Sequence, residues 1–166
     1  LSDKEGIGKE IAQRRKEIVI REYAPTLRPT PGAHELVVRI REEGLRPVIA
    51  TSAESDELQV LLRAAGIADL IGDAAHSSDT GRSKPDPDIV QAALEKSGAR
   101  PEESLMIGDT PYDIEAAHSA GVEVIAVRCG GHDTDLEGAL AVYDNLADIL
   151  AHWEETPLAR KAAARS

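Results

Sequence analysis

Phenylalanine is absent from this sequence, and aromatic residues make up only 2% of the chain. The interior must therefore be filled by Ile, Leu, Val and Ala. Cys129 is the single cysteine, which excludes an internal disulfide and favours a reducing compartment, so we expect a cytoplasmic protein. No apolar run approaches the roughly 20 residues that a membrane-spanning helix needs, so we expect no membrane partner.

Basic residues are also fewer than acidic residues in this chain. The chain has 19 Lys and Arg against 30 Asp and Glu, a formal net charge of −11. This balance argues against nucleic acid or an anionic membrane surface as the main partner. It does not exclude small anions, because a local site can be positive on an acidic protein. The 166 residues suffice for one compact domain with its own core.

Apolar residues recur with helical and with strand-like spacing in alternation. Helical spacing predicts helices over residues 4–22, 33–43, 54–65, 87–97, 111–120 and 146–153. Short apolar runs predict strands over residues 47–51, 73–76, 104–108, 122–128 and 141–143. This alternation predicts an α/β fold, a doubly wound parallel sheet with helices on both faces. Ligands of such sheets bind at the carboxyl ends of the strands.

Polar residues of a particular kind follow these strands. Thr51 and Ser52 end the first strand, and Asp109 ends the strand at 104–108, with Asp113 four residues later. Lys84 lies between them in sequence, in a loop that leads into a helix. A phosphate group binds hydroxyl and N–H donors and a compact cation, and Mg²⁺ prefers carboxylate oxygens. The residues together indicate a site for phosphate and Mg²⁺.

Each of these residues also has a purely structural interpretation. Threonine is common in strands, and a loop lysine such as Lys84 is usually a solvated charge. Thr110 could cap the helix that follows, with Asp113 stabilising the positive end of its dipole. This interpretation leaves Asp109 unexplained, because Asp109 lies at the strand end and outside the helix.

Three segments resemble motifs two, three and four of the haloacid-dehalogenase-like (HAD) superfamily. They are Val48–Ser52, Ser83–Pro87 and Met106–Asp113. The connector Arg28–Gly32 resembles the segment by which the helical cap re-enters the core in that family. The resemblance covers about residues 4–153 and implies a Rossmann-like, HAD-like core. It divides the chain into a remnant of a helical cap (1–27), the core (28–153) and a tail (154–166) that we expect to be mobile.

The resemblance also implies roles for the strand-end residues. Thr51 and Lys84 would be catalytic: the Thr51 hydroxyl and the Ser52 N–H would bind the phosphoryl group, and Lys84 would neutralise its charge. Asp109 would bind Mg²⁺ directly, and Asp113 would hold the waters of the metal or orient Lys84. The implied function is a Mg²⁺-dependent phosphatase acting on a small phosphorylated metabolite.

Motif one of the family is absent from the chain. It is a strand that ends in Asp-x-Asp, whose first aspartate is the nucleophile and whose second is the general acid and base. In the family this strand lies in the middle of the sheet, between the strands that end here at Thr51 and Asp109. We therefore expect that the chain is truncated at its N-terminus, that it is inactive alone, and that its exposed sheet edges could self-associate.

Other functions stay open. The motifs do not separate a phosphoglycolate phosphatase from a β-phosphoglucomutase-like hexose-phosphate mutase, and a pseudophosphatase that binds phosphate without turnover also fits. A receiver-like signalling domain is weaker, since receivers keep their acidic cluster early in the chain. The five histidines are scattered without ligand spacing, and Cys129 has no neighbouring base, so we assign them structural or surface roles.

Overall fold

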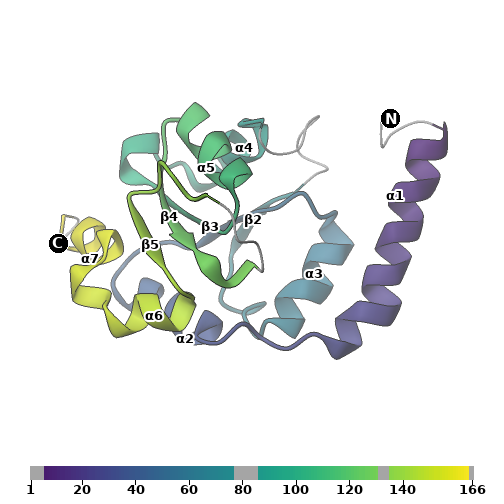
Figure 1. The fold of residues 1–166 in the computed structure, drawn as a ribbon, viewed down its shortest axis with the longest axis horizontal. Coiled ribbons are helices and arrows are strands. Elements are labelled where there is room, and N and C mark those ends of the chain that lie inside the picture. Colours follow the sequence, from purple (N-terminus) through teal and green to yellow (C-terminus); the bar gives the residue numbers. More distant parts are fainter. Residues whose placement is uncertain (1–5, 77–85, 131–134, 165–166) are drawn as a thin grey trace.

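The computed structural model describes residues 6–76, 86–130 and 135–164 (Figure 1). Its longer helices are α1 (Gly6–Ile18), α2 (Ala33–Glu42), α3 (Ser55–Ala64), α4 (Asp88–Ser97), α5 (Pro111–Ser119), α6 (Leu146–Ala151) and α7 (Pro157–Ala163). Its strands are β1 (Val48–Ala50), β2 (Asp73–Ala75), β3 (Leu105–Gly108), β4 (Glu123–Val127) and β5 (Ala141–Tyr143). Short helical turns occupy Val19–Tyr23, Ala24–Thr26, Pro101–Glu103, Arg128–Gly130 and Trp153–Glu155. No helix in the described ranges is long and apolar enough to cross a bilayer.

All paired strands run parallel, which confirms the predicted α/β class. The pair β1–β2 forms one sheet, with Val48 opposite Asp73. The strands β3, β4 and β5 form a second sheet in that order, with Leu105 opposite Glu123 and Ile125 opposite Ala141. Because the strands are parallel within each sheet, their carboxyl ends share one edge of it.

The two sheets are not joined by a ladder between β1 and β3. Among the described strands, β1 pairs only with β2, and β3 pairs only with β4. Strand β4, which is paired on both sides, contains Val124, Ile125 and Ala126, each 0% exposed, whereas every residue of β1 is half-buried. The division falls between the two strands that the family resemblance places on either side of the missing strand.

Helices cover both faces of the three-stranded sheet, as predicted (Figure 1). Val124 and Ala126 of β4 pack into a cluster with residues of α4 and α5. Ile125 and Val127, which alternate with them, pack against α2, α6 and α7. This alternation follows from the two-residue period of a strand, which sends successive side chains to opposite faces.

Helix α3 forms a third apolar cluster with β1 and β2. Leu58 and Leu62 of α3 are buried there, and Ile49 of β1 packs against them. The helix predicted over residues 54–65 is confirmed as α3. Helix α1 lies beside α3, at the end of the molecule opposite to α7 (Figure 1). The turn after β1, where Thr51 is found, therefore leads into the helix that α1 accompanies.

The first helix differs from the prediction in length and in burial. It ends at Ile18, and Val19–Tyr23 forms a π-helical turn instead of continuing to residue 22 as an α-helix. Its apolar residues Ile7 and Ile11 are 66% and 56% exposed. The helical spacing of these apolar residues therefore does not correspond to a fully buried face, and α1 contacts α3 through charged side chains.

The C-terminal segment also differs from the prediction. The expectation of a mobile tail is wrong for residues 157–163, which form α7 with Leu158 and Ala162 buried. Leu158 packs in the cluster that contains Ile149 of α6. Thr156 caps this helix: its Oγ1 accepts a hydrogen bond from the Ala159 N–H at 3.1 Å. A threonine followed by a proline at the first helical position is a helix-start pattern that the sequence contained.

Candidate phosphate and metal site

Asp109 directly follows strand β3 and is held there through its backbone. Its N–H donates a hydrogen bond to Oδ2 of Asp113 at 3.1 Å. Asp113 belongs to the first turn of α5 and is only 4% exposed. The structure therefore brings together the two aspartates that the sequence proposed as metal ligands.

The carboxylate of Asp113 also caps helix α5. Its Oδ2 accepts hydrogen bonds from the Thr110 N–H at 3.0 Å and from the Thr110 hydroxyl at 2.8 Å. The Asp113 N–H in turn donates to the Thr110 Oγ1 at 3.2 Å, which completes a capping box. The structural interpretation of Asp113 is thus confirmed, and one of its carboxylate oxygens is engaged by three donors.

The absence of a side chain at Gly108 leaves room for the Asp113 carboxylate. A Cβ atom at Gly108 would lie 2.5 Å from the Cβ and 3.0 Å from the Cγ of Asp113. Any side chain at this position would displace Asp113 and, through it, the backbone of Asp109. The Gly-Asp-x-x-x-Asp spacing therefore has a local physical cause, the close approach of the first turn of α5 to the last residue of β3.

The same local arrangement recurs after β5. The Asp144 N–H donates to Oδ2 of Asp148 at 2.9 Å, and Asn145 caps α6 by accepting from the Asp148 N–H at 3.0 Å. An aspartate after a strand with a second aspartate four residues on is therefore a helix-start arrangement in its own right. The two pairs differ in burial, because the Asp148 side chain is 28% exposed and Asp113 is 4% exposed.

Thr51 and Ser52 form the turn between β1 and α3. The Thr51 N–H donates to the Ala75 carbonyl at 3.0 Å, which extends the pairing of β1 with β2 by one residue. The Thr51 Oγ1 accepts a hydrogen bond from the Ala53 N–H at 3.2 Å. A hydroxyl that accepts one bond can still donate its own hydrogen. Ser52 is exposed. The turn can thus present a hydroxyl and backbone N–H groups to an anion.

The candidate residues come from separate elements. Thr51 follows β1 and Asp109 follows β3, and both strands contribute to one apolar cluster through Ala50 and Met106. Lys84, the proposed cation of the site, lies outside the described residues. The structure thus places the aspartate pair and the threonine turn at strand ends, whereas the place of Lys84 in the site is expected from the sequence alone.

A magnesium ion fits the donor set of Asp109 and Asp113. Among the described residues there is no group of three or more His, Cys, Asp and Glu that could hold a metal by themselves. Mg²⁺ does not require such a group, because it is usually bound through one or two carboxylates, with waters and phosphate oxygens in the other positions. The hard oxygens of the aspartate pair suit Mg²⁺ better than a soft metal.

Cys129 follows β4, in the short turn Arg128–Gly130. Partial desolvation raises the pKa of its thiol, and the negative charge of Asp109 raises it further. The thiol is therefore protonated, and the thiolate is the reactive form. The sequence-based assignment of Cys129 as non-catalytic agrees with this shift.

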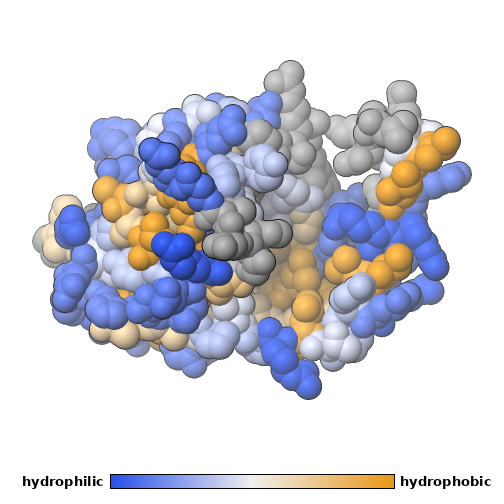
Figure 2. Space-filling view, in the orientation of Figure 1, coloured by the Kyte–Doolittle hydropathy of each residue, from blue (hydrophilic) through white to orange (hydrophobic). Residues whose placement is uncertain are grey.

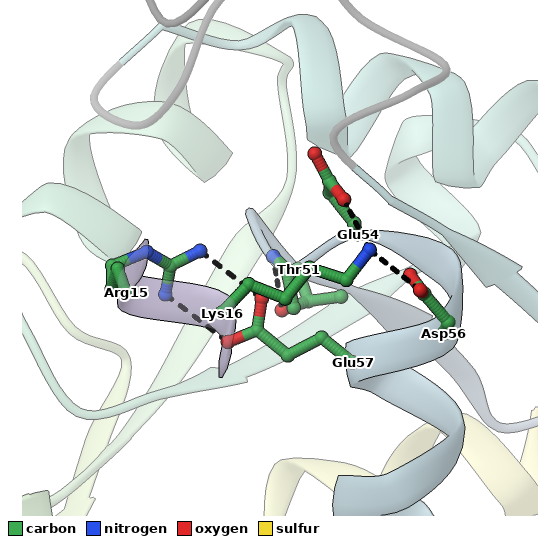
Figure 3. A network of polar contacts seen from close by, with 7 residues as sticks. Arg15, Lys16, Thr51, Glu54, Asp56 and Glu57 are labelled. Carbon is green, nitrogen blue, oxygen red and sulfur yellow. Dashed lines mark hydrogen bonds and ion pairs between the residues drawn. The ribbon is translucent and has the colours of Figure 1, made fainter. Parts of the chain in front are cut away.

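A network of charged residues beside Thr51 was not found by sequence reasoning (Figure 3). Arg15 and Lys16 of α1 contact carboxylates at the start of α3. Hydrogen bonds to Asp56 and Glu54 raise the pKa of Lys16, and the bond from Lys16 lowers the pKa of Asp56. About 40 residues separate the partners in sequence, for example Arg15 and Glu57, so no spacing pattern could have linked them.

Parallel strands with helices on both faces define an α/β protein, and a hydroxyl turn and an aspartate pair follow two of these strands. The family model described as haloacid dehalogenase-like hydrolase matches residues 2–127. The chain belongs to this family, as its motifs two to four indicated.

Individual relatives agree with this assignment. A phosphoglycolate phosphatase of Rhodospirillum rubrum is 33% identical over 121 residues, which are 72% of this chain and 50% of that protein. The solved structure of a hydrolase from Pseudomonas syringae has a TM-score of 0.80 at 30% identity, covering 89% of this chain and 71% of that one. CbbY from Rhodobacter sphaeroides, solved with phosphate, has a TM-score of 0.66 at 25% identity, covering 72% and 55%. The chain spans about half the length of the curated relatives it matches.

Proposed function

We propose that this chain is the phosphate- and magnesium-binding part of a HAD-type phosphatase that acts on a small phosphate ester. The observation that carries the proposal is Asp109, which directly follows a parallel strand and whose backbone is held by the buried carboxylate of Asp113. The capping of α5 alone explains Asp113 but not the choice of an aspartate at 109. The similarity to a phosphoglycolate phosphatase supports the class of substrate.

Each site residue has a proposed role in this function. The Thr51 hydroxyl and the Ser52 N–H bind oxygens of the phosphoryl group, and Lys84 neutralises its charge. Asp109 is the direct Mg²⁺ ligand, and Asp113 orients Asp109 and holds the waters of the metal. Bound Mg²⁺ would supply neutralisation of the charge on the phosphoryl oxygens. Positioning and charge neutralisation are the main contributions a protein makes to phosphoryl transfer.

The function also needs a carboxylate nucleophile. None of the described strands is followed directly by Asp-x-Asp. We place the nucleophile on a further strand that pairs with the open edges of β1 and β3, supplied by residues of a longer chain. Central strands of a parallel sheet are normally buried on both faces and paired on both edges, and β1 and β3 meet neither condition.

Magnesium binding tests the proposal without requiring turnover. We expect isothermal titration calorimetry to detect Mg²⁺ binding by the 166-residue chain, and Asp109→Asn to weaken it at least tenfold, about 1.4 kcal/mol. Asp144→Asn is the matched control, because Asp144 occupies the same position after β5 and contacts Asp148 in the same way. Equal Mg²⁺ affinity in the wild type and in Asp109→Asn would contradict the proposed metal site.

Turnover of an aryl phosphate with Mg²⁺ tests the missing nucleophile. We expect no turnover by the 166-residue chain and turnover by a longer chain that contains an Asp-x-Asp strand. Activity of the shorter chain that Asp109→Asn abolishes would refute the proposed absence of the nucleophile.

Two other functions are supported by particular observations. Because none of the described strands is followed directly by Asp-x-Asp, a non-catalytic module that binds phosphate and Mg²⁺ also fits the structure. Structural similarity to a β-phosphoglucomutase-like protein, with a TM-score of 0.76 at 26% identity, favours a hexose-phosphate mutase. A longer chain that binds Mg²⁺ without hydrolysing any ester would support the first, and phosphoryl transfer between hexose hydroxyls would support the second.

A further inference from the structure

Helix α1 is attached to the start of α3 by five charged side chains, which we call the α1 latch: Arg15, Lys16, Glu54, Asp56 and Glu57 (Figure 3). The two Arg15 N–H groups donate to the two carboxylate oxygens of Glu57 at 3.1 and 3.0 Å. The Lys16 Nζ lies 2.8 Å from Glu54 and 2.5 Å from Asp56. Two adjacent cations of one helix thus meet three carboxylates of another.

The latch is partly buried on both sides. The Glu57 side chain is 3% exposed and the Lys16 side chain 17% exposed, although neither residue type is usually buried. A buried carboxylate is stable only when it is paired and hydrogen-bonded, and the bidentate contact with Arg15 satisfies both requirements. The pairs therefore depend on α1 staying in place, and α1 in turn depends on the pairs.

Apolar contact contributes little to the attachment of the first half of α1, whereas Ile18 at the end of the helix is half-buried. Ile7 and Ile11 are 66% and 56% exposed, so the first half of the helix buries little apolar surface against the described residues. Figure 2 shows hydrophobic residues on the surface of this part of the molecule, among hydrophilic ones. Non-directional apolar burial is the usual means by which a helix is held on a domain. Here the charge pairs contribute to the attachment beside the half-buried Ile18, which makes the attachment sensitive to salt.

The segment after α1 departs from regular α-helical geometry. The π-helical turn Val19–Tyr23 and the 3₁₀ turn Ala24–Thr26 follow it, and neither contains a buried residue. A π-turn interrupts the regular hydrogen bonds of a helix, and kinks concentrate at such places. Rotation about this segment would move α1 as a unit without disturbing the buried clusters.

The latch borders the proposed phosphate turn. Helix α3 begins at Ser55, four residues after Thr51, and Glu54 is its N-cap residue. Figure 3 draws Thr51 in the same view as the latch side chains. Release of α1 would therefore remove two cations from the carboxylates that follow the turn at Thr51.

We propose that the α1 latch is an ionic switch that holds α1 beside the turn at Thr51 and releases it as ionic strength rises. This inference rests on the proposed function for the role of Thr51. The attachment itself is a property of five charged residues and can be measured without Mg²⁺, phosphate or turnover, so failure of the latch and failure of the phosphatase proposal are distinguishable.

Distance measurements between two spin labels test the latch. One label is attached to the native, exposed Cys129, and the other to Ile11→Cys on α1. At low salt we expect mainly the attached distance. In 1 M NaCl, where the screening length is about 3 Å, a second, longer distance should gain about tenfold in relative population, since two to three partly exposed pairs weaken together.

The variant Arg15→Met/Lys16→Met removes both cations but keeps the aliphatic stems. It should show the longer distance at low salt and no further response to salt. Arg14→Met is the matched control, because among the described residues Arg14 pairs within α1, with Glu17 at 3.5 Å, and should behave as the wild type. The charge exchange Lys16→Glu/Asp56→Lys should restore part of the attached population that Lys16→Glu alone loses.

Two results would overturn the proposal. One is an Arg15→Met/Lys16→Met variant with the distance distribution of the wild type while its far-ultraviolet circular dichroism shows an intact fold. The other is a salt response of that variant equal to the wild-type response. If the latch responds as proposed but Asp109→Asn binds Mg²⁺ as tightly as the wild type, the ionic switch is supported and its connection to a phosphatase site is contradicted.

Discussion

Single residues at strand ends do structural and chemical work at the same time. The carboxylate of Asp113 caps α5 and also holds the backbone of Asp109 in the position from which its side chain could reach a metal. Because one buried group would perform both tasks, we predict that substitutions around it change both the stability and the Mg²⁺ affinity of the proposed site. Asp109 is different, since its side chain is not part of the capping box.

Gly108→Ala tests the space that Asp113 occupies. The added Cβ would lie 2.5 Å from the Asp113 Cβ, so either the first turn of α5 or the end of β3 must shift. We expect a loss of about 1–3 kcal/mol in the free energy of unfolding, measured by urea denaturation. Gly72→Ala is the control, because a Cβ at Gly72 meets no atom within 4 Å. Equal stability of the two variants would show that the site adjusts freely.

His152 makes the stability of the C-terminal part depend on pH. The Asp148 carbonyl accepts a hydrogen bond from its ring, and together with the nearby Asp148 carboxylate this raises the pKa of His152 above 6.5. The charged form is therefore favoured in the folded protein. Its contribution is fully present below pH 6.5 and is lost as the pH rises through the higher folded-state pKa.

The comparison of Tm for the wild type and His152→Gln between pH 5.5 and 8 (roughly the range in which histidine titrates) measures this contribution. We expect the wild type to be the more stable at the lower end and the difference to shrink toward the upper end. A difference that grows with pH would contradict the assigned direction of the pKa shift.

At the scale of elements, close contacts between helix ends determine the packing around the three-stranded sheet. Gly32 begins α2 with a φ of 79°, and a Cβ there would lie 2.5 Å from the backbone nitrogen of Ala147 in α6. Only glycine combines this backbone conformation with so close an approach. Trp153 is buried beneath Arg39 of α2, whose guanidinium lies 5.2 Å from the ring centre. The C-terminal helices are thus part of the core.

Leu158→Ala tests whether α7 contributes to the core. Leu158 is 6% exposed and packs in the cluster that contains Ile125 and Ile149. We expect a loss of about 2–5 kcal/mol in the free energy of unfolding. The control is Leu140→Ala at a position that is 49% exposed, with an expected change within about 0.5 kcal/mol. Similar small effects of both would restore the hypothesis of a mobile tail.

At the scale of the whole molecule, the main feature is a sheet divided between β1 and β3. Two strands that belong to the interior of a parallel sheet each expose one edge among the described strands. Unpaired edges are templates for strand addition. The division supports both the proposed nucleophile strand of a longer chain and self-association through the open edges. The two differ in their effect on activity, because only the nucleophile strand is expected to give turnover.

Much of the fold followed from local pattern. The strands at 105–108 and 123–127 and the helices at 88–97 and 111–119 lie within a residue or two of their predicted bounds, because apolar period and glycine stops are local properties. The predictions that failed, at α1 and α7, concern contacts between segments that are far apart in sequence. Burial of Leu158 and exposure of Ile11 depend on what lies opposite, which is decided by segments far away in sequence.

The sequence by itself determined the family, the parallel α/β class and the set of candidate site residues, because motifs and apolar periodicity are properties of short, continuous segments. Only the tertiary structure decided that Gly108 makes room for Asp113, that β1 and β3 do not pair, and that Arg15 meets Glu57. These facts concern atoms brought together by packing. Separation along the chain carries no information about which distant charges or edges will meet.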